Sequence, residues 1–448
     1  MNAVTLPWGR LGAYGVLALP LAMAALPVYV HLPKLYADNL GLPLGIVGGV
    51  LLAARLLDAA QDTLIGWWSD HAAHHRGGRE RLVLIGVPLL AVGMIGLFHP
   101  PEGGAIALAG WLAGCLVITY LGFSMATISY FAIGAALSPD YHERTRVTAV
   151  RSVFGVVGVL LAAALPEWLG AGSNAADGLR VFSLAYVPIL LVGTAALLFG
   201  APRAAIASTR HAARGLRASI VAPLRNTAFR WLLLVFVISG IASAIPATLI
   251  LFYVQDVLGA PQLNAAFLGT YFLFGALGMP LWVWTSRRIG KKGAWQLGMG
   301  MSIVAFVGAL FLGNGDAWAF GLVCALSGIA YGAELALPPS ILADVVDRDT
   351  AGADSGAVGD SSRPDGAYFG LWQVSEKLNL ALAAGIALPV VGLLGYVPGT
   401  SQGPLGPVSF VYAAVPCVLK LIAVLALQIA PVDRQTWSGA PPTGEVTP

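Results

Sequence analysis

The sequence predicts an all-α membrane protein whose twelve transmembrane helices form two pseudo-symmetric six-helix bundles, and three observations support this class. The 448 residues are 57% hydrophobic and 10% charged, whereas about a quarter of the residues in soluble domains are charged. Twelve apolar runs reach the length of about 20 residues that spans a bilayer. A long basic segment separates the sixth run from the seventh. This composition excludes an ordinary soluble enzyme, a disulfide scaffold and a disordered chain.

The twelve runs follow one another along the chain, with short loops between most of them. They centre near Met23, Leu52, Leu90, Gly122, Gly158, Ile189, Ile241, Phe274, Val304, Leu326, Ala383 and Leu421. The first run extends from about Leu11 to Tyr36, which is too long for the apolar core of a cleavable signal peptide. We therefore expect the first run to be a membrane span.

The two halves of the chain carry similar sequence after equivalent spans. Gly66–Asp70 and the arginines that follow it close the second span, and Thr285–Lys292 follows the eighth. Parallel six-helix repeats produce such matched positions, although each basic loop alone could be a topology signal. The chain then divides into an N-terminal bundle, a cytoplasmic central loop, a C-terminal bundle and a cytoplasmic tail expected to be disordered, at residues 1–200, 201–228, 229–432 and 433–448.

Lysine and arginine are distributed unequally between the two sides of the predicted membrane. With the N-terminus in the cytoplasm, 19 of the 25 lie on the cytoplasmic side, and only Lys34 and Arg180 lie on the other. Cytoplasmic loops of membrane proteins carry this excess. We therefore expect both termini in the cytoplasm and the chain to be integral to the plasma (inner) membrane. The net charge of +3 gives no indication of nucleic-acid binding.

The second predicted span contains three charged side chains, although each such residue costs about 2.5–3.5 kcal/mol in a bilayer core. Arg55, Asp58 and Asp62 are spaced by three and four residues, which places them on one helical face, with Gln61 beside it. Two carboxylates one turn apart can bind a hard cation such as Na⁺ or share a proton. A purely structural Arg55–Asp58 ion pair is the alternative.

The tenth and eleventh spans add further polar candidates. Lys377 requires a carboxylate partner at its depth, and Asp58 or Asp62 across the interface between the halves would supply one. A local Glu376–Lys377 arrangement with no role in transport is the alternative. Glu334 precedes the helix-kinking pair Pro338–Pro339 and would be either a second proton or substrate site or a packed, protonated glutamate. Polar and aromatic side chains ahead of Lys377 are also substrate candidates, namely Tyr368, Trp372 and Gln373.

The cytoplasmic ends of the helices are expected to be clamped together by their loops in one conformational state. The candidate gate residues are the charged side chains of the two matched loops and of the loop between the fourth and fifth spans, namely Asp70, Arg79, Arg144, Arg287 and Arg288. The remaining question is which solute and which ion such a gated bundle would carry.

Three ordered segments resemble one transporter family. Arg55–Asp70 has the sequence RLLDAAQDTLIGWWSD, Ser138–Thr145 has SPDYHERT, and ADVVD at Ala343–Asp347 precedes GAYFG at Gly366–Gly370. These segments resemble the glycoside–pentoside–hexuronide:cation symporters of the major facilitator superfamily, to which the melibiose permease belongs. The resemblance implies a twelve-helix symporter that carries a small solute, such as a sugar or glycoside, with Na⁺ or H⁺ by alternating access.

The resemblance also implies roles for individual residues. Asp58 and Asp62 match the family's cation-binding carboxylates, so Na⁺ would bind there, and Gln61 stands in place of an asparagine of the permease. Ser124 matches a hydroxyl that completes this site in the family. Lys377 matches a lysine of the eleventh helix, and Arg151 matches an arginine of the fifth. These matches make Arg151 a further substrate candidate.

The sequence departs from the permease at the positions that bind sugar. Thr127, which stays a substrate candidate, replaces an aspartate of the fourth helix, and Ala22 replaces an aspartate of the first. Thr63 replaces the family's usual proline after the second aspartate. A substrate that is less polar or differently charged than a galactoside is therefore credible. The family also includes transporters of lysolipids and of sulfonated or acidic sugars, and the choice among these stays open.

The sequence contains no nucleophile-plus-base pair, metal-ligand spacing or phosphate-binding loop. We therefore expect no enzymatic activity and no cofactor apart from the coupling ion. The expected partners are a small-molecule substrate, the coupling cation and the bilayer, without nucleic acid, and the expected state is a monomer. The alternatives are a proton-coupled exporter of a drug or metabolite with Asp62 and Glu334 as proton carriers, a lysolipid symporter, and a non-transporting membrane enzyme or scaffold.

Overall fold

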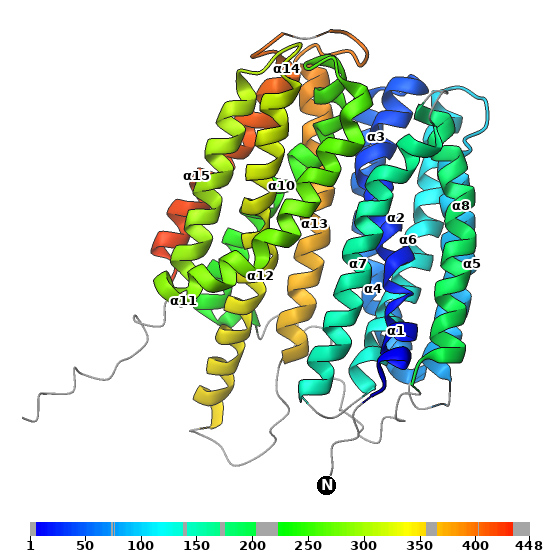
Figure 1. Cartoon of the computed structure of the whole chain (residues 1–448), viewed down its shortest axis with the longest axis vertical. Coiled ribbons are helices and arrows are strands. Elements are labelled where there is room, and N and C mark those ends of the chain that lie inside the picture. Colours follow the sequence, from blue (N-terminus) through cyan, green and yellow to red (C-terminus); the bar gives the residue numbers. More distant parts are fainter. Residues whose placement is uncertain are drawn as a thin grey trace, which may run out of the picture.

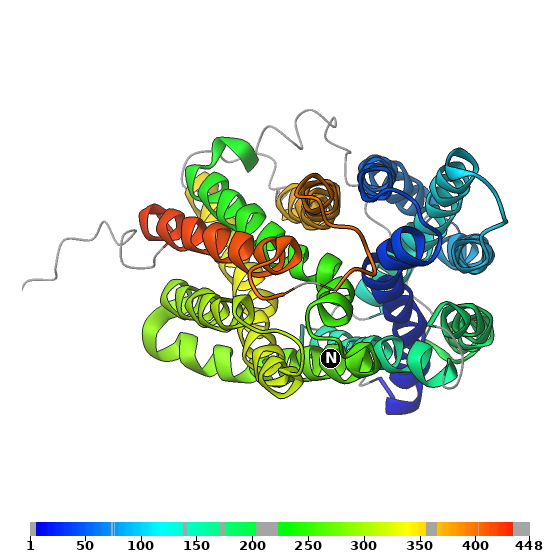
Figure 2. The same ribbon diagram turned by 90° about the horizontal axis from the view of Figure 1, so that it is seen from above.

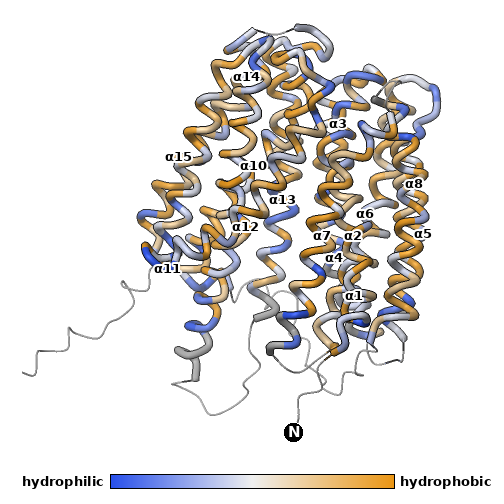
Figure 3. The backbone as a smooth tube through the Cα atoms, viewed as in Figure 1, coloured by the Kyte–Doolittle hydropathy of each residue, from blue (hydrophilic) through white to orange (hydrophobic). Residues whose placement is uncertain are grey.

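A computed structural model describes residues 6–72, 75, 77–137, 141–170, 175–202, 223–354, 365–401 and 403–432 of the chain. Over these residues the protein is helical and contains no β-strand (Figure 1). Eleven helical segments within these ranges are long and apolar enough to cross a membrane. Apolar residues dominate the length of these segments, and polar residues gather toward the ends of the bundle (Figure 3). The predicted all-α membrane fold is confirmed.

The N-terminal half begins with one irregular span and continues with five more regular ones. In the first span, α1 (Trp8–Gly15), α2 (Ala18–Leu26) and α3 (Leu32–Lys34) alternate with the π-helical turns η1 (Pro27–His31) and η2 (Leu35–Asn39). Prolines at 20, 27 and 33 lack the backbone donor that a regular helix needs, which accounts for the irregularity. The next five helices are α4 (Leu44–Ala72), α5 (Gly78–Phe98), α6 (Ala105–Ala136), α7 (Tyr141–Leu169) and α8 (Ala175–Ala195), which η3 (Ala196–Gly200) extends.

The C-terminal half contains one helix that is twice as long as a span. Its elements are α10 (Thr227–Asp256), η4 (Pro261–Leu263), α11 (Asn264–Leu310), α12 (Ala317–Asp354), α13 (Asp365–Leu393), α14 (Pro407–Ser409), η5 (Phe410–Ala414) and α15 (Val415–Ile429). Within α11, Gly290 has φ 80° and ψ 159°, a conformation that glycine adopts readily and a helix does not contain. Gly290 therefore separates the predicted eighth and ninth spans, and the eleven apolar segments comprise twelve spans.

The two halves pack side by side, as the view from above shows (Figure 2). Across the boundary between them, α4 packs against α13, α7 against α11, and α10 against η1. The beginning of α1 and the end of α15 lie at the same end of the bundle (Figure 1). We call this the basic end, because the turn around Gly290 and the start of α5 place Arg79, Arg287, Arg288 and Lys291 there. The cytoplasmic location of the basic end stays a prediction.

Glycines allow neighbouring helices to approach closely. A Cβ atom added at Gly122 of α6 would collide with the backbone of Leu90 in α5, and one added at Gly86 would collide with the backbone of Gly122. Gly110, on the same helix α6, faces open space. Close backbone packing drives helix association in membranes, where lipid is as apolar as a side chain. The contact between α5 and α6 therefore depends on Gly122.

We expect Gly122→Ala to destabilise the protein by about 1–3 kcal/mol, because the backbones of α5 and α6 must move apart. Gly110→Ala is the matched control, and it should be neutral or stabilising, since alanine is favoured over glycine in helices by about 1 kcal/mol. Thermal unfolding of both variants in detergent measures the difference. Equal unfolding temperatures would contradict the packing described for Gly122.

Candidate functional site

Asp58 of α4 is the buried centre of a polar cluster in the N-terminal half, with 1% of its surface exposed. Ser124 of α6 donates a hydrogen bond to Asp58 Oδ1 at 3.1 Å, and the Arg55 guanidinium lies 3.3 Å from Oδ2. Arg55 also lies over the ring of Tyr120, 4.2 Å from its centroid. A buried carboxylate is tolerated only with such partners. The partners therefore satisfy both carboxylate oxygens of Asp58.

Lys377 of α13 reaches this cluster from the C-terminal half. Its Nζ lies 2.9 Å from Asp58 Oδ2 and 2.5 Å from Asp62 Oδ2, and it donates a hydrogen bond to Ser124 at 3.2 Å. The ammonium therefore bridges two carboxylates of α4 and ties the two halves together. We call Arg55, Asp58, Asp62, Ser124 and Lys377 the interface cluster.

The interface cluster pairs two carboxylates with two cationic side chains and still offers oxygen atoms to a small cation. Asp62 Oδ1 and Gln61 Nε2 are buried without hydrogen-bond partners among the described residues. Carboxylate, hydroxyl and amide oxygens suit a hard cation such as Na⁺, and a carboxylate also accepts a proton. Of the five residues predicted to bind the cation, four are in contact and Gln61 lies beside them on α4. A cation entering here must compete with the Lys377 ammonium.

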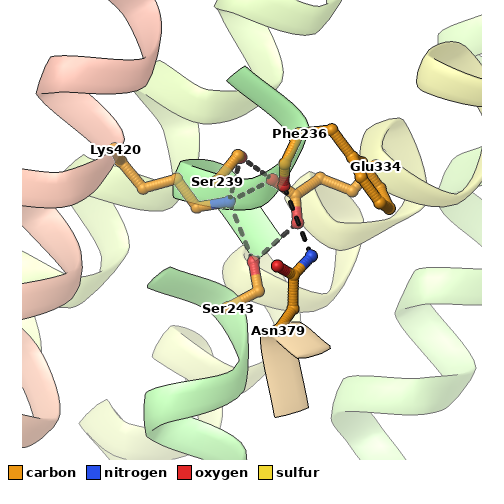
Figure 4. A network of polar contacts seen from close by, with 6 residues as sticks. All are labelled: Phe236, Ser239, Ser243, Glu334, Asn379 and Lys420. Carbon is orange, nitrogen blue, oxygen red and sulfur yellow. Dashed lines mark hydrogen bonds and ion pairs between the residues drawn. The ribbon is translucent and has the colours of Figure 1, made fainter. Parts of the chain in front are cut away.

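A second buried polar cluster lies wholly within the C-terminal half (Figure 4). Glu334 of α12 accepts hydrogen bonds from Ser239 and, at 2.6 Å, from Ser243, both on α10. It also forms an ion pair with Lys420 of α15. Lys420 donates hydrogen bonds to the hydroxyls of Ser239 and Ser243 at 2.9 and 2.8 Å. We call Ser239, Ser243, Glu334 and Lys420 the C-terminal cluster.

Lys420 is a site residue that the sequence argument does not single out. Its side chain is 3% exposed and lies deep in the last span. A lone lysine inside an apolar run is the signal that could have identified it, because such a cation needs a buried anion. Which anion it meets depends on how α12 and α15 pack, and sequence spacing does not contain that information.

A cavity of about 280 Å³ lies where the C-terminal half meets the first span. Its wall includes Tyr29 of η1, Ser243 and Glu334 of the C-terminal cluster, and Glu376 of α13. This volume is close to the lower end of the range for small-molecule pockets, roughly 300–1,000 Å³. Among the substrate residues predicted from the sequence, Glu334 lines this cavity, which makes it the candidate substrate site.

Other predicted substrate residues of the C-terminal half lie behind or away from the cavity wall. Trp372 is stacked on Phe236, with ring centroids 3.7 Å apart, and Phe236 lines the cavity. Tyr368 donates a hydrogen bond to Asp349 at 2.8 Å instead. Gln373 is exposed on α13. Trp372 therefore supports the wall, whereas Tyr368 contributes to the end of the bundle.

The two predicted substrate residues of the N-terminal half do not line the cavity in the described structure. Arg151 of α7 lies over the ring of Phe131, 4.1 Å from its centroid. The Thr127 hydroxyl is buried on α6 without a hydrogen-bond partner among the described residues. Neither contact places a solute, so their roles as substrate residues stay predictions.

The predicted gate residues at the basic end make their described contacts within one half. Arg79 donates a hydrogen bond to the carbonyl oxygen of Ala132 at 3.2 Å. Arg288 lies 4.1 Å over the Trp284 ring, and Arg287 is exposed on the same helix, α11. The side chains of Asp70 and Arg144 lie outside the described part of the structure. A clamp between the halves at this end stays a prediction.

At the opposite end the two halves contact each other directly. Gln255 of α10 donates a hydrogen bond to Asp38 of η2 at 3.0 Å. The backbone N–H of Ala265 on α11 donates to Glu167 of α7 at 2.7 Å. Each of these bonds joins an element of one half to an element of the other. The halves are therefore held together at the end opposite to the basic end.

The loop after α13 is fixed to the same end. The Tyr396 phenol and, at 3.1 Å, the backbone N–H of Gly399 donate hydrogen bonds to Asp256, the last residue of α10. Burial raises the pKa of Tyr396 well above its ordinary value, and the neighbouring Asp256 carboxylate raises it further. The phenol therefore keeps its proton and remains a hydrogen-bond donor.

Comparisons with known proteins agree with this architecture. A family model described as MFS/sugar transport protein matches residues 12–434. The isoprimeverose transporter of Lactiplantibacillus pentosus is 23% identical over 96% of this chain and 89% of its own length. The glucuronide carrier protein homolog of Escherichia coli (strain K12) is 23% identical over 90% of this chain and 88% of its own.

A solved structure shares the fold at low identity. It is a bacterial homolog of the human lysosomal transporter Spinster in an inward-facing, unoccupied conformation, with a TM-score of 0.67 and 15% identity. The match covers 94% of this chain and 95% of that protein. The fold of this chain is therefore shared with that solved structure.

We expect Ser124→Ala to destabilise the protein by about 1.5–3 kcal/mol, because Asp58 would lose a charge-assisted hydrogen bond while remaining buried. The matched control is Ser129→Ala on the same helix, since the Ser129 hydroxyl is buried without a partner among the described residues. Removing that unpaired hydroxyl should be neutral or stabilising. Thermal unfolding in detergent compares the two, and a loss at Ser129 equal to that at Ser124 would contradict the assignment.

Proposed function

This chain belongs to the MFS/sugar transport protein family, and we propose that it is a cation-coupled symporter of a sugar-like solute. The isoprimeverose transporter and the glucuronide carrier homolog, which are similar along almost the whole chain, support a solute of this kind. The cavity beside Glu334 is the proposed solute site, and the interface cluster is the proposed cation site. No covalent step is needed, because moving the two halves relative to each other exposes both sites to one side at a time.

The observation that carries the proposal is the position of Lys377. Its ammonium lies between Asp58 and Asp62, at 2.9 and 2.5 Å, where a coupling cation would also bind. Na⁺ or H⁺ at these carboxylates therefore competes with Lys377 and weakens the link between α4 and α13. Cation binding thereby shifts the equilibrium between two arrangements of the halves, which is the differential interaction that coupling requires.

Solute and cation are proposed to favour the same arrangement. Binding of the cation at Asp58 and Asp62 favours the outward-open form and raises the affinity for solute, and release of both opens the inner gate. Coupling free energies between sites are typically about 1–3 kcal/mol. The free energy of exchanging one ion pair for a bound cation is of the same order as this coupling free energy.

The described contacts suit the inward-open stage of this cycle. Gln255–Asp38 and Ala265–Glu167 hold the halves together at the end opposite to the basic end. With the basic end in the cytoplasm, as the lysine and arginine distribution predicts, these contacts form the outer gate. The basic loops, including Arg79, Arg287 and Arg288, would form the inner gate in the other state. We propose that one monomer carries out the whole cycle.

Asp58→Asn and Asp62→Asn should each abolish gradient-driven accumulation, because an amide neither exchanges the coupling proton nor supplies the negative charge that holds Na⁺. Uptake is measured in proteoliposomes with a solute identified from a panel of sugars, glycosides, organic acids and lysolipids. Separate Na⁺ and pH gradients identify the ion. The matched control is Asp177→Asn, since Asp177 is half-exposed and pairs with Arg180 at 3.5 Å on the surface.

One outcome would contradict the cation site, and a second would show that the loss of transport is not specific to it. Retained accumulation in either aspartate variant would show that its carboxylate is not required. Loss of the same size in the Asp177→Asn control would show that the assay reports general damage to the protein. An export of the solute driven by an inward pH gradient would favour the proton-coupled exporter instead.

Lys377→Gln should raise the apparent affinity for the cation and slow turnover, because both carboxylates lose the ammonium that displaces the bound ion. The cation dependence of uptake gives the affinity, and the maximal rate gives the turnover. Lys291→Gln is the control, since Lys291 pairs with Asp344 at 2.6 Å in a partly exposed position, where ion pairs contribute little. Unchanged cation selectivity and transport in Lys377→Gln would refute the role of Lys377.

A further inference from the structure

The charge of the cavity wall carries information about the solute. Two carboxylates line the cavity, Glu334 and Glu376, and no lysine or arginine is among its described lining residues. Cations close to the lining residues are engaged elsewhere, and Arg55 belongs to the interface cluster. Lys377 holds the interface cluster, and Lys420 binds Glu334 from behind. An anionic solute in this cavity would face two carboxylates without a cation to pair with.

Glu334 is fixed as an acceptor. Its Oε1 accepts hydrogen bonds from Ser239 and Lys420, and its Oε2 accepts one from Ser243. Lys420 is 3% exposed, whereas the Glu334 side chain is 12% exposed. The Lys420 ammonium contacts Glu334 and the two serines (Figure 4), and Lys420 is not among the residues that line the cavity. Oε2 has one described donor, Ser243, and a carboxylate oxygen can accept a second hydrogen bond.

Glu376 contributes a second and less constrained acceptor. It is exposed to the cavity on α13 and has no ion pair or hydrogen bond among the described residues. The adjacent Lys377 points to Asp58 and Asp62 in the interface cluster. Intramembrane carboxylates are rare and usually pair or serve a transported species. An unpaired carboxylate in a solute cavity therefore calls for a cationic or proton-donating ligand.

Aromatic rings surround the two carboxylates. The lining includes Tyr29 from the N-terminal half and Phe236, Tyr271, Phe272 and Tyr331 from the C-terminal half. The faces of such rings attract cations, and cages of this composition bind ammonium groups in other proteins. The rings also stack against the apolar face of a sugar. The same cavity can thus hold a pyranose ring and a positive charge.

We propose that the solute carries a protonated amino group, which Glu376 and Glu334 bind within the aromatic wall. The inference rests on the proposed function, because it assigns a substrate class to the cavity of that symporter. A solute of this class is an amino sugar or an aminated glycoside. Glu376 acts as the specificity-determining residue, and Lys420 acts as a positioning residue for Glu334.

Thiol labelling tests the charge preference without any need for transport. A cysteine introduced by Ala247→Cys, one turn from Ser243 on the cavity wall, is treated with a trimethylammonium or a sulfonate methanethiosulfonate of similar size. The native cysteines are buried or half-buried, so the unsubstituted protein supplies the background rate. Gly403→Cys, on an exposed loop, normalises the intrinsic reactivities of the two reagents.

The normalised rate should favour the cationic reagent by about tenfold, because Ala247 and Glu376 line the same cavity and an unpaired charge there attracts the cation through a low dielectric. Glu376→Gln in the same background should reduce this preference to about threefold or less. Glu102→Gln, at an exposed loop carboxylate, is the matched control and should leave the preference unchanged. Equal or faster reaction of the sulfonate reagent would overturn the proposal, as would a preference that persists in Glu376→Gln.

Three glycosides that differ only at C6 identify the chemical group that the cavity prefers. Methyl glucoside, methyl 6-amino-6-deoxyglucoside and methyl glucuronide carry a hydroxyl, an ammonium and a carboxylate. The amine should protect the introduced thiol at the lowest concentration, and protection by the glucuronide at an equal or lower concentration would overturn the proposal. Failure of gradient-driven uptake with a normal labelling preference would instead refute the symport mechanism alone.

Discussion

An ammonium held between two carboxylates inside the membrane is the interaction on which the arrangement of the two halves depends. Asp58 is almost inaccessible to solvent, so its charge requires partners that are themselves buried. Arg55 and Ser124 come from its own half, but Lys377 comes from α13 of the other half. The two helices must therefore meet at this depth. Any motion that separates them must first supply a substitute for the Lys377 charge.

The C-terminal cluster uses the same chemistry for a different purpose. Glu334 and Lys420 both belong to one half, together with the two serines that bind them. Their geometry is therefore preserved when the halves move as rigid bodies. The interface cluster crosses the boundary and changes with that movement. The ion pairs of Lys377 with Asp58 and Asp62 can thus be exchanged as the halves move, whereas the Glu334–Lys420 ion pair stays intact beside the cavity.

Much of the fold, and part of the site, could be predicted from the sequence. Hydropathy located the spans, and the spacing of Asp58 and Asp62 put both carboxylates on one face of α4. Periodicity gives the face of a helix but not the neighbour that it meets. For this reason the sequence did not pair Lys420 with Glu334 or turn Tyr368 toward Asp349, and it did not indicate that the irregular first span brings Tyr29 to the cavity.

The carboxylates of α4 and the cavity wall lie mostly in different halves, and this separation affects how such proteins diversify. The carboxylates of the proposed cation site belong to α4, whereas the described polar residues of the cavity wall come from the C-terminal half, apart from Tyr29. Substitutions on α10, α12 and α13 can alter the wall without touching Asp58 or Asp62. Lineages can therefore acquire new cargo while keeping these carboxylates, as long as α13 retains Lys377, which pairs with both of them.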